Sequence, residues 1–324
     1  MLSQFSYQRA ASIQEAVEAA SRPQARLLAG GTDLLGCLRD RVFEANRLVS
    51  LNGLQALKGI TPGAGGGLRI GALTTLNEIA ENRQVIGGYR VLAQAAAAVG
   101  SPQLRNQGTL GGNLCQRPRC SYFRGDFPCR RKGGDTCFAA SGDNQLHCIF
   151  GGSSCFMVHP SDTAAALVAL DAKLNIAGRR GTRVVPAGSF FLLPAASLEK
   201  ENVLQPGEII TEIVLDPPKP SVRSLYRKVR ERGAFDFALA GAAIVLTIAG
   251  GNVLNARVVL SGVAPVPWRS AGAEKAIAGK PLSTEVILAA AQAAIQDAAP
   301  LAENEYKVPL VRGILEEALA ALAA

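Results

Sequence analysis

Residues 27–35, LLAGGTDLL, end an apolar strand at two adjacent glycines and begin a helix directly afterwards. Because Gly30 and Gly31 have no side chains, backbone N–H groups here can approach an anion closely, and the start of the helix favours negative charge. A diphosphate fits this arrangement. The spacing is neither GxGxxG nor that of a Walker loop, so a standard Rossmann or P-loop assignment fails. A tight turn capped by Thr32 or Asp33 is the alternative.

A second glycine segment lies at residues 107–113, QGTLGGN. It offers flexible backbone donors, the hydroxyl of Thr109 and the carboxamide of Asn113. We expect the two glycine segments to contact one ligand between them. Taken alone, the second segment is more typical of an ordinary glycine turn than of a ligand contact.

Helices and strands alternate around these segments, which predicts an α+β (mixed α/β) fold. Capping boxes predict helices that begin at Ser12 and Thr75, and an alanine-rich helix ends at Gly100. Residues 101–160 lack periodicity. The remaining predicted elements are strands at 26–29, 48–51, 68–71, 209–215, 224–230, 237–248 and 253–263, and helices at 163–170, 284–298 and 308–323.

Seven cysteines are present, and five of them lie between Cys120 and Cys155. A chain of this size does not need a disulfide framework, so metal binding is the better explanation. A 4Fe-4S cluster requires four thiolates that converge from a flexible segment, with donors and cations nearby. Zinc is the main alternative, although no CxxC pair is present. Cys37 is predicted to be a buried small apolar residue, and His147 and His159 to be hydrogen-bonded loop residues.

The net charge of +8 and the pI of about 9.3 require nucleic acid to be considered as a partner. The sequence has one Trp, five Tyr and no nucleic-acid motif, and its positive charge concentrates around the cysteines. The prediction is therefore no nucleic acid. No stretch approaches the roughly 20 apolar residues that span a bilayer, and no secretory signal opens the sequence, so we expect neither a membrane span nor an export signal.

Five motifs occur in a specific order: AGGTDLL, TLGGN, HPSD, QPGEII and YRKVRERGAFDFALA. Together they resemble the FAD-binding (medium) subunit of the xanthine dehydrogenase and carbon monoxide dehydrogenase family of molybdenum hydroxylases. The resemblance covers nearly the whole chain. It implies a two-lobed PCMH-type FAD-binding domain at 1–218, with an insertion at 114–160, and a smaller α+β domain of the CO dehydrogenase flavoprotein type at 221–324.

The cysteine-rich insertion narrows this resemblance to a subset of the family. It is similar to the flavin subunits of periplasmic aldehyde oxidoreductase, through QRPRC, CFMVHPSD and LRNQ, and of 4-hydroxybenzoyl-CoA reductase, both of which carry a 4Fe-4S cluster there. The resemblance implies Cys120, Cys129 and Cys137 as ligands. The fourth is Cys155, seven residues before Asp162, or alternatively Cys148.

Carried over residue by residue, the resemblance implies a set of FAD contacts. Leu204 would approach the isoalloxazine through its backbone, and Lys228 would lie near its polar edge. The alternatives are a helix-capping carboxylate for Asp162 and a solvated strand residue for Lys228. No catalytic acid or base is nominated. The full set is Ala29, Gly30, Gly31, Thr32, Asp33 and Leu34 at the diphosphate, Thr109, Gly112 and Asn113 nearby, Ser161 and Asp162 at the ribityl and phosphate region, and Leu204 and Lys228.

The implied function is electron transfer. A molybdenum cofactor-binding large subunit would hydroxylate the substrate, a small subunit with 2Fe-2S clusters would relay electrons, and FAD on this chain would reduce an external acceptor. Substrate, acceptor and subunit stoichiometry stay open. The expected compartment is the cytoplasm, or the periplasm by co-export with a signal-bearing partner. Rival hypotheses are a 4-hydroxybenzoyl-CoA reductase-like subunit, a self-sufficient flavin oxidase and a zinc-stabilised binding module without redox turnover.

Overall fold

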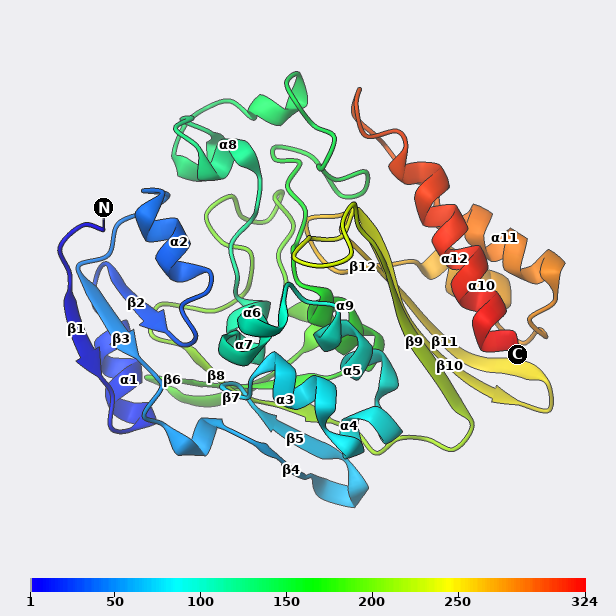
Figure 1. Cartoon of the computed structure of the whole chain (residues 1–324), viewed down its shortest axis with the longest axis horizontal. Helices are drawn as coiled ribbons and strands as arrows, with labels where there is room; N and C mark the ends of the chain where they lie inside the picture. Colours follow the sequence, from blue (N-terminus) through cyan, green and yellow to red (C-terminus); the bar gives the residue numbers. More distant parts are fainter. Residues whose placement is uncertain (1) are drawn as a thin grey trace.

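The structure is a computed structural model that describes residues 2–324, whose strands form three sheets (Figure 1). The first is a small parallel sheet in the order β1 (Ser6–Arg9), β3 (Arg47–Ser50), β2 (Ala25–Leu28), accompanied by α1 (Ile13–Ala20) and α2 (Leu34–Arg39). Ser12 caps α1, because its Oγ accepts from the Glu15 backbone N–H at 3.1 Å. The Glu15 carboxylate accepts from the Ala11 N–H, one residue earlier than a capping box requires.

The second sheet is antiparallel and has five strands. Their order is β4 (Ile60–Pro62), β5 (Leu68–Gly71), β8 (Ile209–Leu215), β6 (Lys173–Gly178), β7 (Gly181–Pro186). Helices α3 (Leu76–Glu81), α4 (Arg83–Gly88), α5 (Arg90–Ala97) and α9 (Asp162–Ala169) accompany it. Thr75 and Glu78 form the predicted capping box in full, which fixes the start of α3.

The third sheet belongs to the C-terminal part of the chain, in the order β12 (Trp268–Arg269), β11 (Asn252–Ser261), β10 (Ala240–Ala249), β9 (Val222–Val229). Successive side chains of a strand point to opposite faces. Ala243 and Val259 therefore enter the core around α5 and α9, whereas Ala242 and Ile244 enter the core beneath the C-terminal helices. Those helices are α10 (Ala271–Ile277), α11 (Thr284–Ala294) and α12 (Lys307–Ala323), which cover the outer face of this sheet in Figure 1.

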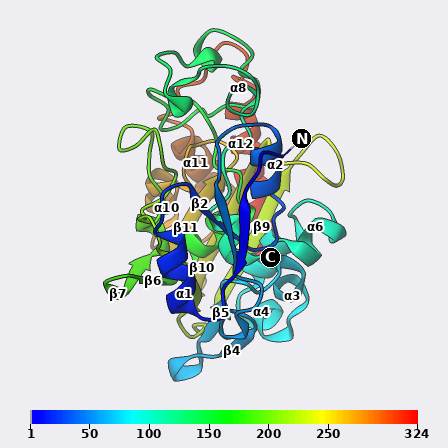
Figure 2. The same ribbon diagram turned by 90° about the vertical axis from the view of Figure 1, so that its left-hand side faces the viewer.

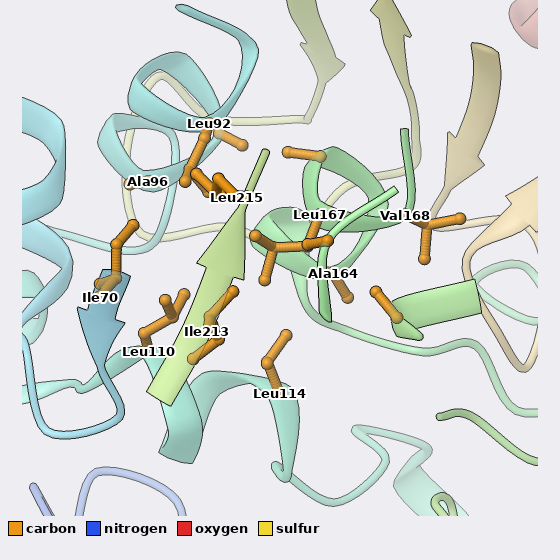
Figure 3. Packing of buried hydrophobic residues seen from close by; sticks show 14 of the residues in the cluster. Ile70, Leu92, Ala96, Leu110, Leu114, Ala164, Leu167, Val168, Ile213 and Leu215 are labelled. Carbon is orange, nitrogen blue, oxygen red and sulfur yellow. The ribbon is translucent and has the colours of Figure 1, made fainter. Parts of the chain in front are cut away.

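Helix α9 lies at the centre of the molecule. All eight of its residues are buried, which explains why the sequence DTAAALVA has no polar face. Leu167 and Ala164 point toward Ile213 and Leu215 of β8 (Figure 3). On its other side α9 contacts β10 and β11, so one helix joins the second sheet to the third.

The predicted irregular segment 101–160 contains short helices that the composition concealed. They are α6 (Pro102–Gln107), α7 (Leu110–Leu114) and α8 (Ser121–Arg124), followed by 3-10 turns such as Arg130–Lys132. The part from α8 onward projects from one end of the molecule (Figure 2). Its far side docks on the C-terminal part, because Asn304 Nδ2 donates to the carbonyls of His147 and Cys148 at 3.1 and 3.2 Å.

Within residues 2–324, every helix is too short or too polar to cross a membrane.

We expect Leu167→Ala to destabilise the protein by about 2–5 kcal/mol, because it opens a cavity where α9 meets β8. Urea unfolding of the apoprotein measures this. Leu254→Ala, at a leucine whose exposed fraction is 63%, is the matched control and should stay within about 0.5 kcal/mol. Equal effects of the two changes would contradict the packing described here.

Candidate functional site

A cavity of about 490 Å³ lies where the first sheet, the central helices and the C-terminal part of the chain meet. Its size is typical of a cofactor pocket. Twelve of the thirteen residues predicted to bind a cofactor line it; Ser161 is buried beside it and does not line it. The twelve are Ala29, Gly30, Gly31, Thr32, Asp33, Leu34, Thr109, Gly112, Asn113, Asp162, Leu204 and Lys228.

The two glycine segments touch each other at the wall of the cavity. A Cβ on Gly30 would lie 1.9 Å from the carbonyl oxygen of Gln107, so only glycine permits this approach. Gly31 adopts φ +73°, which also favours glycine. Within residues 2–324, the backbone N–H groups of residues 30–34 donate to no protein acceptor. The first segment is therefore a set of free donors that faces the cavity, as a bound anion requires.

The expectation of free backbone donors in the second segment is wrong. Leu110 N–H donates to the Thr74 carbonyl and Gly111 N–H to the Ala72 carbonyl. Gly112 N–H donates to Thr109 Oγ1, because Thr109 is the N-cap of α7. These backbone N–H groups are therefore already hydrogen-bonded within the protein and are not free for a ligand. What the segment gives the cavity is the backbone surface of its glycines and the side chain of Asn113.

Asn113 is held by two hydroxyl groups at the start of α9. Ser161 Oγ and Thr163 Oγ1 donate to Asn113 Oδ1 at 2.5 and 2.7 Å. Ser161 Oγ also accepts from the Ala164 N–H and thereby caps α9. Because Oδ1 is engaged, the carboxamide orientation is fixed and its Nδ2 is the group that remains for a ligand. Ser161 thus does not line the cavity itself, but its hydrogen bond fixes the side chain of Asn113, which does.

Asp162 and Lys228 form a buried ion pair at the base of the cavity. Lys228 Nζ lies 2.7 Å from Asp162 Oδ2, and each side chain has an exposed fraction of 4%. Lys228 also donates to the Ala98 carbonyl at 3.1 Å, and Tyr226 donates its hydroxyl to Asp162 Oδ1 at 2.6 Å. Burial and the adjacent Asp162 charge raise the pKa of Tyr226. The alternative of a solvated strand residue for Lys228 is therefore wrong. Asp162 forms this ion pair and also lies in the first turn of α9.

Leu204 lies on the loop that precedes β8. Its N–H donates to Asn202 Oδ1 at 3.1 Å and its carbonyl accepts from Lys200 Nζ at 3.3 Å. These contacts hold the backbone of Leu204 against the cavity.

Sequence reasoning missed many lining residues, among them several aromatic and basic side chains. Phe235 and Phe237, in the loop between β9 and β10, are exposed at the cavity; Phe235 has φ +64° and donates its N–H to the Gly100 carbonyl. Arg119 lies over the Phe237 ring at 4.8 Å, and Arg26 over the Phe43 ring at 4.7 Å. The signal was present in YRKVRERGAFDFALA, whose two phenylalanines flank an aspartate in a turn.

Asp33 ties the first glycine segment to the cysteine-rich insertion. Its carboxylate accepts from the Arg117 N–H and from Arg124 Nη2, each at 2.7 Å, and lies 2.9 Å from Arg119 Nη2. The sequence indicated a concentration of positive charge around the cysteines. In the structure Asp33, 84 or more residues away in the chain, neutralises part of this charge.

The predicted metal ligands Cys120, Cys129, Cys137 and Cys155 line one small pocket in the insertion. Cys137 and Cys155 hydrogen-bond each other, which lowers the pKa of the Cys137 thiol to about 6 and raises that of Cys155. Burial raises the pKa of Cys120, partly offset by the backbone N–H groups of Phe123 and Tyr122. The four cysteines therefore share one pocket, with backbone donors near the thiols of Cys120, Cys137 and Cys155.

The cysteine pocket encloses about 20 Å³, room for about one water molecule, so a cluster would bind there only after the lining residues moved apart. In this arrangement residues 2–324 contain no group of three or more His, Cys, Asp or Glu side chains placed around a single metal ion. Cys148 is buried outside the pocket lining, and burial raises its pKa to about 12. His147 Nε2 lies 3.3 Å from Cys120 Sγ. As predicted, Cys37 is buried, and burial raises its pKa to about 11.

Comparison with known proteins gives two matching families. The sequence profile described as FAD binding domain in molybdopterin dehydrogenase matches residues 3–218, and that of the CO dehydrogenase flavoprotein C-terminal domain matches residues 224–322. The chain is 37% identical to the aldehyde oxidoreductase FAD-binding subunit PaoB of Escherichia coli (strain K12), over 98% of this chain and 97% of the relative.

Two further relatives extend the comparison. The chain is 31% identical to the xanthine dehydrogenase FAD-binding subunit of Escherichia coli O157:H7, over 98% of this chain and 96% of that one. Its structure superposes with a TM-score of 0.79 on a chain of carbon monoxide dehydrogenase from Hydrogenophaga pseudoflava that lacks the Mo-pyranopterin moiety of the molybdenum cofactor, at 28% identity, covering 99% and 98% of the two chains.

We expect Gly30→Ala to destabilise the protein by about 1–3 kcal/mol, because the new Cβ forces the two glycine segments apart. Gly313→Ala, within α12 and free of neighbours, is the matched control and should stabilise by up to about 1 kcal/mol. Thermal unfolding of both variants tests the difference in sign. A neutral Gly30→Ala would show that the segments are not in contact.

Burial lowers the pKa of His159 to about 4, against a smaller opposing effect of the Leu114 carbonyl. Because the unfolded chain binds this proton near pH 6.5, His159 contributes stability above pH 6.5 that is lost as the pH falls toward 4. We therefore expect wild type to lose about 2 kcal/mol more than His159→Gln between pH 7 and pH 5. Urea unfolding at both pH values measures this; parallel losses in the two proteins would refute it.

Proposed function

Because the chain belongs to the family of FAD-binding subunits of molybdopterin dehydrogenases, we propose that it is the electron-transferring FAD subunit of a molybdenum-containing hydroxylase complex of the aldehyde or xanthine dehydrogenase type. The observation that carries this proposal is the cavity of about 490 Å³, to which both glycine segments and the C-terminal domain contribute. Bound there, FAD supplies exchange between two-electron and one-electron chemistry.

The free N–H groups of residues 30–34 would hold the FAD diphosphate, since no protein acceptor within residues 2–324 uses them. Asn113, fixed by Ser161 and Thr163, would offer its Nδ2 to the phosphate or ribityl region. The buried Lys228 would place positive charge beside the polar edge of the flavin, with Asp162 setting its position. Leu204 would pack through its backbone against the ring. No residue needs to act as an acid or base, because this chain would move electrons only.

We also propose that the insertion holds a 4Fe-4S cluster on Cys120, Cys129, Cys137 and Cys155. Three observations support it: the four cysteines line one pocket, backbone N–H groups lie near the thiols of Cys120, Cys137 and Cys155, and Arg131 donates to Cys155 Sγ at 3.3 Å. Such donors and cations stabilise the negative charge of a cluster. Cys155 is favoured over Cys148 as the fourth ligand because only Cys155 lines the pocket.

The partners follow from the family. A large subunit with the molybdenum cofactor would oxidise the substrate, a small subunit with 2Fe-2S clusters would deliver the electrons, and an external acceptor would receive them from FAD. Aldehyde oxidoreductase is the type to which the identity of 37% points. The cytoplasm, or the periplasm by export together with a partner subunit, remains the predicted compartment.

The test is an absorption spectrum of the anaerobically purified protein with FAD, iron and sulfide quantified. We expect one FAD and about four irons per chain. Cys155→Ser should lose the iron and keep the flavin, whereas the matched change Cys148→Ser should keep both, because Cys148 does not line the pocket.

Each other outcome identifies a different error. FAD without iron would leave the flavin subunit standing and end the cluster proposal. Iron lost in Cys148→Ser alone would move the fourth ligand to that residue. Zinc without FAD would favour the binding module and end the proposed function, and turnover of a small substrate by the isolated chain would favour the oxidase.

A further inference from the structure

Arg131 is a buried cation that no part of the flavin cavity uses. It lies on the 3-10 turn directly after Cys129, and its side chain has an exposed fraction of 1%. Its Nε donates to Cys155 Sγ at 3.3 Å. Its Nη1 donates to Glu201 Oε1 at 2.7 Å and to the Leu198 carbonyl at 3.1 Å. One guanidinium therefore connects a proposed cluster ligand to a buried carboxylate.

The third nitrogen of this side chain has an unused donor. Arg131 Nη2 is buried and has no hydrogen-bond acceptor among residues 2–324. Arg131 also lines the cysteine pocket. Buried donors are nearly always paired, so an acceptor belongs here. A sulfide or thiolate sulfur of a cluster in that pocket provides one. The guanidinium would then donate to the cluster from two of its nitrogens.

Glu201 holds Arg131 in place and partly offsets its charge. The Glu201 carboxylate, with an exposed fraction of 6%, also lies 2.8 Å from Arg117 Nε, and Arg117 lines the flavin cavity. Two arginines and one glutamate leave a net positive charge between the cysteine pocket and the cavity. Charge and hydrogen bonds at the sulfurs are the properties that set the reduction potential of an iron–sulfur cluster.

We infer that Arg131 is a positioning residue that raises the reduction potential of the 4Fe-4S cluster, and that Glu201 sets the size of this effect. The inference rests on the proposed function, because it requires the cluster. Reduction adds negative charge to the cluster, and a guanidinium that donates to its sulfurs stabilises that charge. Removal of Arg131 should therefore lower the potential, whereas neutralisation of Glu201 should raise it.

The experiment is a redox titration of the anaerobically purified complex, followed by low-temperature EPR of the reduced 4Fe-4S signal. We expect Arg131→Met to lower the ratio of reduced to oxidised cluster about tenfold at a fixed potential, a shift of about 59 mV for one electron. Glu201→Gln should shift the ratio upward. Arg130→Met is the charge-matched control. Arg130 lies on the same turn and also lines the pocket, but its side chain is exposed and donates to the Asp135 carbonyl rather than to sulfur.

Opposite shifts in the two variants, with little change in Arg130→Met, support the inference, since a disturbed fold would not reverse in sign. Four irons in every protein with unchanged potentials would overturn it and leave the proposed cluster intact. If Arg131→Met loses its iron, the potential of the cluster in Glu201→Gln becomes the deciding measurement. A potential higher than in wild type supports the inference, and an unchanged or lower one overturns it. Wild type without iron would end the proposed cluster and this inference together.

Discussion

The ion pair between Lys228 and Asp162 is the constraint on which the arrangement of the cavity depends. Lys228 comes from β9 of the C-terminal domain, Asp162 from the first turn of α9, and the carbonyl of Ala98, which also accepts from Lys228, follows α5. Both charges are buried, so each requires the other. Loss of one partner of such a pair typically costs about 3–5 kcal/mol, because the remaining charge is left without compensation.

A second set of polar contacts fixes the position of the cysteine-rich insertion. On one side Asp33 binds the Arg117 backbone N–H, Arg119 and Arg124, and on the other Asn304 Nδ2 donates to the carbonyls of His147 and Cys148. A segment with little regular structure is thereby fixed between two folded bodies. Long irregular loops need such support, and here polar side chains supply it.

Much of this fold could be predicted from local signals. The caps at Ser12 and Thr75 and the strands predicted at 224–230, 237–248 and 253–263 indicated elements that the structure contains, with bounds that differ by up to three residues. The hairpin of β6 and β7 escaped notice because residues 173–186 carry few apolar alternations. The cavity residues on the two glycine segments followed from motifs. Arg119, Phe237 and the pairing of Asp33 with Arg124 did not, because contacts between segments so far apart leave no periodic trace in a sequence.

The walls of the cavity run from Arg26 to Phe237, so segments from both domains complete it. During synthesis, the residues of β9 and the following loop leave the ribosome about 200 residues after the first glycine segment. A domain that has folded up to residue 218 still lacks Lys228 and both phenylalanines of the wall. The complete wall of the cavity is therefore available only after Phe237 has been synthesised, about three quarters of the way along the chain.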